Sequence, residues 1–236
     1  MLVPTIEQLK QLMAHMRAEV FPEFFPPAAA PQALALPEAF WAQVPEISRM
    51  VHEDVDAMLH NDPAVSDRGE VILSYPLTQA MLHFRTAHAL YELGVPYVPR
   101  MLTELAHART GIDIHPAAQI GDHFCIDHGT GVVIGATAII GSHVVLYQGV
   151  TLGAKNFEYD AQGRPVDVPR HPILEDHVTV YSNTSILGRV RIGHDTVIGG
   201  NVWLTQDVPA NSVVRQSTPE VRIHNSQFTM HNAQLS

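Results

Sequence analysis

The stretch "IDHGTGVVIGATAIIGSHVVLYQGVTLGA" (residues 126–154) decides the fold. It is rich in Ile, Val and Gly and nearly free of charge, and an aliphatic residue recurs in it every six positions, at Ile134, Ile140, Leu146 and Leu152. A repeat this short predicts one short strand and one turn per unit. Three units would close one triangular coil, and stacked coils would satisfy one another's backbone groups at strand spacing.

The same six-residue series runs through most of the second half of the chain. It begins at Ile114, shifts by two residues before Ile134, and resumes at Leu174 after a polar, Pro-containing insertion at 155–172. Four positions after most of these aliphatics stands a small or β-branched residue, Thr130 among them, as a narrow core would require near its corners. A β-sandwich is the alternative, but its strands would not keep phase over a dozen such units. We therefore predict a parallel β-helix.

The N-terminal part has helical periodicity instead. "TIEQLKQLMAHMRAEVF" (5–21) spaces its apolar residues three and four apart, with Thr5 as a possible N-cap. The Pro/Ala-rich segment "FPPAAAPQALALP" (25–37) predicts an interruption. Asp62, followed by proline, predicts the start of a later helix, and Gly94 and Gly111 predict the ends of the last two.

Composition excludes several classes of protein. The 236 residues carry a formal net charge of −10, which argues against nucleic acid or an anionic membrane surface as a partner. Cys125 is the single cysteine, so neither a disulfide framework nor a Cys-based zinc site is expected. The N-terminus does not resemble a signal peptide, and no uninterrupted apolar stretch reaches the roughly 18 residues of a membrane helix, so we expect a cytoplasmic protein.

Four stretches together carry a resemblance to a known family: "GIDIHPAAQIGDHFCIDHGTGVVIG" (111–135), "LYQGVTLGA" (146–154), "RHPILEDHVTV" (170–180) and "IGGNVWLTQDVPANSVV" (198–214). They resemble serine O-acetyltransferases, which are left-handed β-helix acyltransferases built of hexapeptide repeats. Upstream, "DPAV" and "HFRTAHALYELG" resemble the helical N-terminal domain of that family. The repeat alone would indicate only the fold, whereas "DIHP…DHGTG…RHP" is much more specific.

The resemblance implies an α+β chain of three parts. These are an α-helical N-terminal domain (1–111), a left-handed parallel β-helix (112–214) with a loop insertion (155–172), and a C-terminal tail (215–236). It also implies assembly into a homotrimer or a dimer of trimers. The family often ends in an isoleucine that docks into cysteine synthase; this chain ends in Ser236, which argues against that complex.

The implied reaction moves an acetyl group from acetyl-CoA to the hydroxyl of L-serine, giving O-acetylserine for cysteine biosynthesis. Such a transfer needs a base, donors for the oxyanion and a slot for the pantetheine arm, but neither an enzyme nucleophile nor a metal. The resemblance assigns the base to His128 and its orientation to Asp113. It assigns the ammonium and carboxylate of serine to Asp62, Asp127, Arg170 and His171. It places acetyl-CoA at Gly153, Ala154, Tyr181, Ser182, Gly200 and Asn201.

Each assignment has a structural alternative. Asp62 could be only a helix N-cap, and Arg170 could be a solvated loop charge. Five other histidines at turn positions are interpreted as structural: His115, His123, His143, His177 and His194.

Other functions stay open at this point. Another acyltransferase of the same fold could act on a sugar or a different amine or alcohol, although Asp62 and Asp127 favour a substrate with an ammonium group. A trimeric zinc carbonic anhydrase is a further alternative, but its ligand spacing is not found. A structural or binding protein would not need the "DH" and "RHP" motifs.

Overall fold

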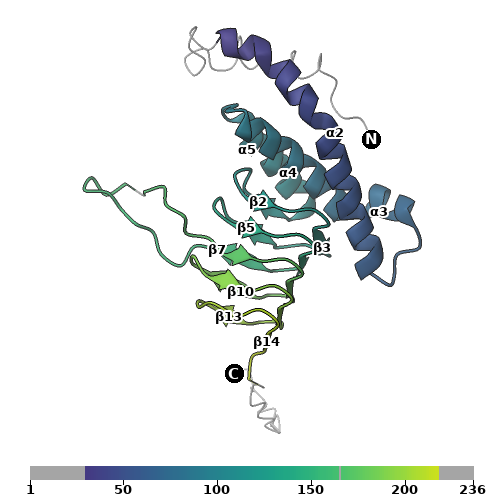
Figure 1. Ribbon diagram of the computed structural model, residues 1–236, viewed down its shortest axis with the longest axis vertical. Coiled ribbons are helices and arrows are strands. Elements are labelled where there is room, and N and C mark those ends of the chain that lie inside the picture. The colour runs from purple at the N-terminus through teal and green to yellow at the C-terminus, as the bar shows by residue number, and fades with distance from the viewer. Residues whose placement is uncertain (1–29, 165, 218–236) are drawn as a thin grey trace, which may run out of the picture.

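The computed structural model describes residues 30–164 and 166–217, with side chains from residue 38 onward (Figure 1). Helices come first: α2 (Ala30–Asn61), α3 (Arg68–Ser74), α4 (Pro76–Glu92) and α5 (Val98–Thr110). Strands of two or three residues follow: β1 (Asp113–Ile114), β2 (Gln119–Ile120), β3 (Cys125–Asp127), β4 (Val133–Ile134), β5 (Ile139–Ile140), β6 (Val145–Tyr147), β7 (Thr151–Gly153), β8 (Ile173–Leu174), β9 (Thr179–Val180), β10 (Ser185–Leu187), β11 (Arg191–Ile192), β12 (Val197–Ile198), β13 (Trp203–Leu204) and β14 (Val213–Val214).

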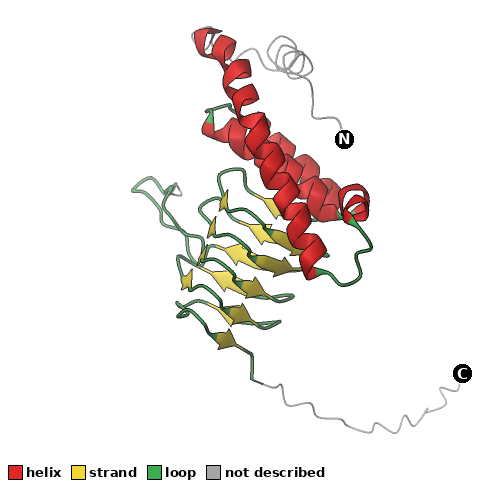
Figure 2. Cartoon of the chain, turned by 45° about the vertical axis from the view of Figure 1, so that its right-hand side comes forward, coloured by secondary structure: helices red, strands yellow, loops and turns green. Residues whose placement is uncertain are grey.

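The strands form three parallel sheets that the chain visits in turn. Sheet A has the order β1-β4-β7-β10-β13, sheet B has β11-β8-β5-β2, and sheet C has β14-β12-β9-β6-β3. Figure 2 shows the coils stacked beneath the helices. We name the turns by the sheets that they join, as the A–B, B–C and C–A corners. The predicted fold class is confirmed: an α-helical N-terminal part followed by a parallel β-helix of hexapeptide repeats.

The coils depart from a regular length at three places, and one of these is the last coil, where Val197 pairs with Val213 over only 16 residues. Ile173 pairs with Arg191, a spacing of 18 residues that corresponds to three hexapeptides. Asp113 pairs with Val133, a spacing of 20, because the first C–A corner holds two extra residues. Between β7 and β8 the insertion leaves the β-helix as a long loop at the A–B corner (Figure 1). This loop and the longer first corner interrupt the repeat near the predicted site residues.

The core of the β-helix is built as the repeat predicts. Inward aliphatics such as Ile134 and Leu152 are buried, and so are most residues four positions later, for example Ala138. Thr130 is an exception. It is exposed, and Val132 fills the corner in its place, because the two extra residues shift the pattern.

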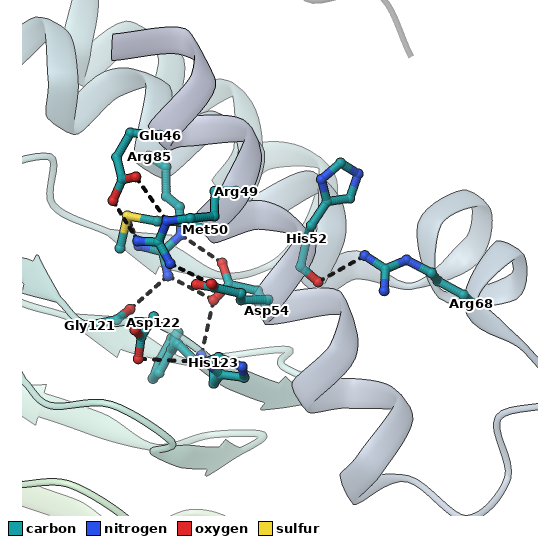
Figure 3. A network of polar contacts seen from close by, with 12 residues as sticks. Glu46, Arg49, Met50, His52, Asp54, Arg68, Arg85, Gly121, Asp122 and His123 are labelled. Atoms are coloured by element: carbon teal, nitrogen blue, oxygen red, sulfur yellow. Dashed lines mark hydrogen bonds and ion pairs between the residues drawn. The ribbon is translucent and has the colours of Figure 1, made fainter.

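The helices share this core with the first coils. Met58, Leu77 and Phe84 belong to the same buried cluster as the aliphatics of the β-helix. A buried ion pair fixes the junction, since Arg85 donates two hydrogen bonds of 2.7 Å to Asp54 (Figure 3). Arg85 also binds the carbonyl of Gly121, and Asp54 accepts the N–H of Phe124. The division of the chain into domains at residue 111 stays a prediction.

Two expectations for the helices are wrong. Helix α2 begins at Ala30, so the Pro/Ala-rich segment does not interrupt it; Pro31 lies in the first turn, where proline is tolerated, and alanines and leucines follow. The N-cap of α3 is Asp67, whose side chain accepts the N–H of Glu70, and not Asp62. Helix α5 does end at Gly111, whose φ of 72° is left-handed.

The helix predicted over 5–21 and the end of the tail lie outside the described residues. Within 30–164 and 166–217, no helix has the length and apolarity needed to cross a membrane.

Candidate active site

The first C–A corner presents Asp127 and His128. Asp127 ends strand β3, and His128 follows with a left-handed φ of 57°. The His128 side chain is 72% exposed, and its Nδ1 lies 3.8 Å from Oδ1 of Asp127. The next residue, Gly129, must be a glycine, because a Cβ there would lie 2.5 Å from Cδ1 of Ile112. The corner thus holds an imidazole in solvent beside a carboxylate.

Asp62 reaches the neighbourhood of this corner from the loop after α2. Its carboxylate accepts the N–H of Ala64 at 2.8 Å and the hydroxyl of Tyr75 at 2.7 Å. These two hydrogen bonds, and then the proximity of His128, hold the pKa of Asp62 below its usual value. The bond to Asp62 is the main cause that raises the pKa of Tyr75 to about 12. Asp62 is therefore an ionised carboxylate, held in place by a phenol.

A column of side chains runs along the same edge of sheet C. Asp127 pairs in register with Tyr147, whose ring stacks on Tyr181 at 4.9 Å between centroids. The next coils bring Ser182, Gly200 and Asn201 to this corner, with the Asn201 N–H donating to the carbonyl of Ser182 at 2.9 Å. Four of the six residues predicted to bind acetyl-CoA therefore lie on the same edge as His128.

His171 lies at the A–B corner, where the insertion returns to the β-helix. It is buried, and its Nδ1 accepts the N–H of Thr137 at 3.1 Å, with the Thr137 hydroxyl at 2.9 Å. Burial, and then the nearby charge of Arg170, lowers the pKa of His171 to about 4. Because Nδ1 accepts a hydrogen bond, the neutral ring carries its proton on Nε2. His171 is therefore a neutral hydrogen-bond donor at physiological pH.

Arg170 precedes His171 at the same corner. Its Nη1 contacts the carboxylate of Asp167 at 3.4 Å, and its guanidinium lies 5.9 Å from the ring centroid of Phe157. Its Nε is buried without a hydrogen-bond partner. Such an orphaned donor is unusual and fits a group that awaits a ligand or a neighbouring chain.

Asp113 stands at the start of β1, on the outer face of sheet A. Its carboxylate lies 3.5 Å from Nη1 of Arg100 on α5. Among the described residues, no hydrogen bond or ion pair joins Asp113 to His128. The orientation of His128 by Asp113 stays a prediction.

The predicted site thus falls into two halves within one chain. Asp62, Asp127, His128, Tyr181, Ser182, Gly200 and Asn201 gather at the C–A edge. Gly153 ends β7 and Ala154 follows it at the A–B edge, with Arg170 and His171. One side of a coil separates the two edges, which six residues make on the order of 15–20 Å long. A single chain therefore does not bring His128 and His171 to one small substrate.

The lone thiol does not belong to this chemistry. Cys125 is buried, and burial raises its pKa to about 12, so it would not form a nucleophilic thiolate.

Sequence reasoning missed Tyr75, Tyr147 and Thr137. Tyr147 follows Asp127 by one 20-residue coil, so the repeat could have found it once the coil length was known. Tyr75 and Thr137 meet their partners across 13 and 34 residues of chain, and nothing in the local sequence marks those contacts.

Known proteins resemble the chain closely. No family model matches it. A plasmid-encoded serine acetyltransferase of Synechococcus elongatus is 47% identical over 83% of this chain and 62% of its own length. A serine acetyltransferase of Helicobacter pylori is 41% identical over 67% of this chain and 88% of its own. The crystal structure of Entamoeba histolytica serine acetyltransferase isoform 3 with cysteine superposes with a TM-score of 0.79 at 36% identity, covering 93% of this chain and 75% of that one. The chain therefore spans less than two thirds of the Synechococcus relative.

Proposed function

The chain belongs to the serine acetyltransferase family, and from that premise we propose that it transfers an acetyl group from acetyl-CoA to the hydroxyl of L-serine. The observation that carries the proposal is the C–A corner, where an exposed imidazole stands beside two carboxylates, Asp127 and Asp62. That set suits a substrate with a hydroxyl to deprotonate and an ammonium to bind. O-Acetylserine is the product, which supplies cysteine biosynthesis.

In the proposed mechanism His128 is the general base. It removes the proton of the serine hydroxyl as the oxygen attacks the thioester carbonyl, and it returns that proton to the departing CoA sulfur. Asp62 and Asp127 bind the ammonium, and the phenol of Tyr75 keeps Asp62 in place. Arg170 and the Nε2–H of His171 bind the carboxylate. The rate then depends on holding the hydroxyl against the thioester.

The site is proposed to form between two chains. The separation of its halves along sheet A supports this, because hydrogen-bond contact requires about 3 Å. In a trimer, the A–B corner of one chain would lie against the C–A corner of the next. The outer face of sheet A carries exposed Val133 and Trp203, which suits burial in an assembly. A cytoplasmic enzyme that works without a metal completes the proposal.

The test of the reaction is thiol release from acetyl-CoA with L-serine, compared with a panel of sugars, amines and other hydroxy amino acids. Chelation should leave the rate unchanged. A preference for an acceptor without an ammonium group would overturn the proposed substrate.

The test of the shared site is a mixing experiment. His128→Ala and His171→Ala should each be nearly inactive alone. Co-assembled trimers, verified by mass, should regain part of the activity, because some interfaces then carry both histidines intact. If the mixed trimers show only the sum of the residual activities of the two parent variants, both histidines act within one chain.

A further inference from the structure

Three histidines form a ladder along the B–C corner, away from the C–A edge that carries His128. His123, His143 and His177 come from successive coils, and their rings stack at 4.4 and 4.8 Å between centroids. All three have a left-handed backbone, with φ between 50° and 58°. Corner geometry explains why a residue such as Asn, Asp or His is used there.

Corner geometry does not explain why histidine is used three times in succession. The equivalent left-handed positions of the C–A corner are Gly131, Gly149, Asn183 and Asn201. Further along the B–C corner they are Asp195 and Asn211. The B–C corner of the first coils therefore gathers imidazoles where glycine or asparagine would serve the backbone.

A carboxylate joins the ladder at its first step. Oδ1 of Asp122 lies 3.6 Å from Nδ1 of His123 (Figure 3). One ligand atom from each of Asp122, His123 and His143 can be chosen so that all lie within 4.8 Å of one another. The side chain of Ser142 forms a hydrogen bond with the carboxylate of Asp122. Ser142 therefore also orients a potential ligand.

Ring stacking alone leaves a polar atom of this cluster without a hydrogen-bond partner. Nδ1 of His123 is buried and has no hydrogen-bond partner. A buried nitrogen without a partner costs stability, and coordination to a cation would satisfy it. The corner is also rigid, because the next residue, Phe124, donates its N–H to the buried Asp54 at 3.0 Å.

We propose that Asp122, His123 and His143 bind one zinc-like transition-metal ion at the B–C corner. Two imidazoles and a carboxylate are a set that zinc, nickel and cobalt accept, with the remaining position left to water. Ligand atoms around tetrahedral zinc are about 3.4 Å apart, so no pair of ligand atoms in the cluster must approach by more than about 1.4 Å. The exposed His143 side chain can supply that movement by rotation. The ion would clamp two successive coils just below α2, and it would take no part in acetyl transfer.

The experiment titrates the full chain, freed of metal by chelation and dialysis, with Zn²⁺ in a calorimeter and with Co²⁺ in a visible absorption spectrum. We expect one ion per chain and a Co²⁺ spectrum with nitrogen and oxygen ligands. His123→Asn and His143→Asn should each weaken binding by at least about 100-fold, since even a residue that only supports a ligand is worth 10–100-fold. Asparagine keeps the left-handed backbone, so these variants should fold.

Three further variants define the site. His194→Asn removes an exposed imidazole at the same corner and should leave binding unchanged. Asp122→Asn removes the carboxylate without changing the shape and should weaken Zn²⁺ binding as the histidine variants do, with an unchanged circular dichroism spectrum. His107→Asn tests a second possible cluster, formed with Glu104 and Asp113. Absence of binding by the folded chain at micromolar Zn²⁺, or binding that survives His123→Asn and His143→Asn, or binding lost only in His107→Asn, would overturn the proposal.

Discussion

Replacing Gly135 with alanine should displace His171 from its pocket. A Cβ at Gly135 would lie 2.0 Å from both Cδ2 and Nε2 of His171, where ordinary contact is about 3.5–4.0 Å. An overlap of roughly 1.5 Å is too large for small adjustments, so the ring must rotate away. Gly135 is not among the glycines with a left-handed backbone, so alanine itself would not be strained there.

The cost follows from the contacts that the ring would lose. Nδ1 of His171 has two hydrogen-bond contacts, with the N–H and the hydroxyl of Thr137. At 0.5–1.5 kcal/mol for each, the substitution should lower the free energy of unfolding by about 1–3 kcal/mol. For a chain of this size that corresponds to a fall in Tm of about 2–12 °C at a fixed protein concentration.

Two assays separate this mechanism from general disruption. In an NMR titration, the pKa of His171 should rise from about 4 towards its usual value as the ring enters solvent. The same Gly135→Ala change made in a His171→Ala background should cost less than about 0.5 kcal/mol, because no ring is left to displace. Equal costs in the two backgrounds, or an unchanged pKa, would refute the steric argument. The KM for serine should rise in Gly135→Ala if His171 binds the substrate carboxylate.

Three further predictions concern the junction, the pH dependence and the base. Arg85→Met should lower the free energy of unfolding in urea by about 3–5 kcal/mol, because it leaves Asp54 buried and unpaired. The double change Asp54→Leu with Arg85→Met should cost less than Arg85→Met alone, and a larger cost for the double change would contradict this. The pKa of His171 is lower in the folded than in the unfolded chain, so its contribution to stability is complete above pH 6.5 and is lost as pH falls towards 4. The free energy of unfolding of His171→Asn should therefore fall less steeply with pH over that window. Parallel stability curves for the variant and the wild type would exclude this role of His171. His128→Ala should lower kcat by about 10²–10⁴ with little change in the KM for acetyl-CoA, and a rate near wild type would remove His128 as the base.

The fold could be predicted because every unit of the repeat must meet the same physical constraint. Each inward aliphatic must fill a narrow core, so a wrong assignment at one unit would break the phase of the next. Thr130 shows the limit of that reasoning, because only the structure shows that the two extra residues belong to the corner before Val132. The start of α2 at Ala30 shows a second limit of sequence-based prediction, since the helix propensity of the alanines and leucines outweighed the proline-rich composition.

The site could be predicted less fully, for a different reason. His128 and Asp127 stand in a motif, so the family resemblance was enough to propose them. Tyr75 contacts Asp62, and that contact depends on how α3 and α4 turn back over the first coil. His123 and His143 were interpreted as turn residues, and their backbone angles agree with that. A ladder appears only when the coil length places one above the other.

Two of the irregularities of the β-helix, the longer first C–A corner and the insertion, carry the two halves of the proposed site. A perfect hexapeptide repeat presents the same short corner on every coil, and such a surface offers no unique place for a substrate. The two extra residues after Asp127 make room for His128 to stand out from the first C–A corner. The insertion ends in Arg170 and His171 at the A–B corner, on the opposite edge of sheet A. Within one chain the two halves lie on opposite edges of sheet A, so the proposed site takes one edge from each of two neighbouring chains. Under this proposal, assembly around sheet A is a requirement of catalysis.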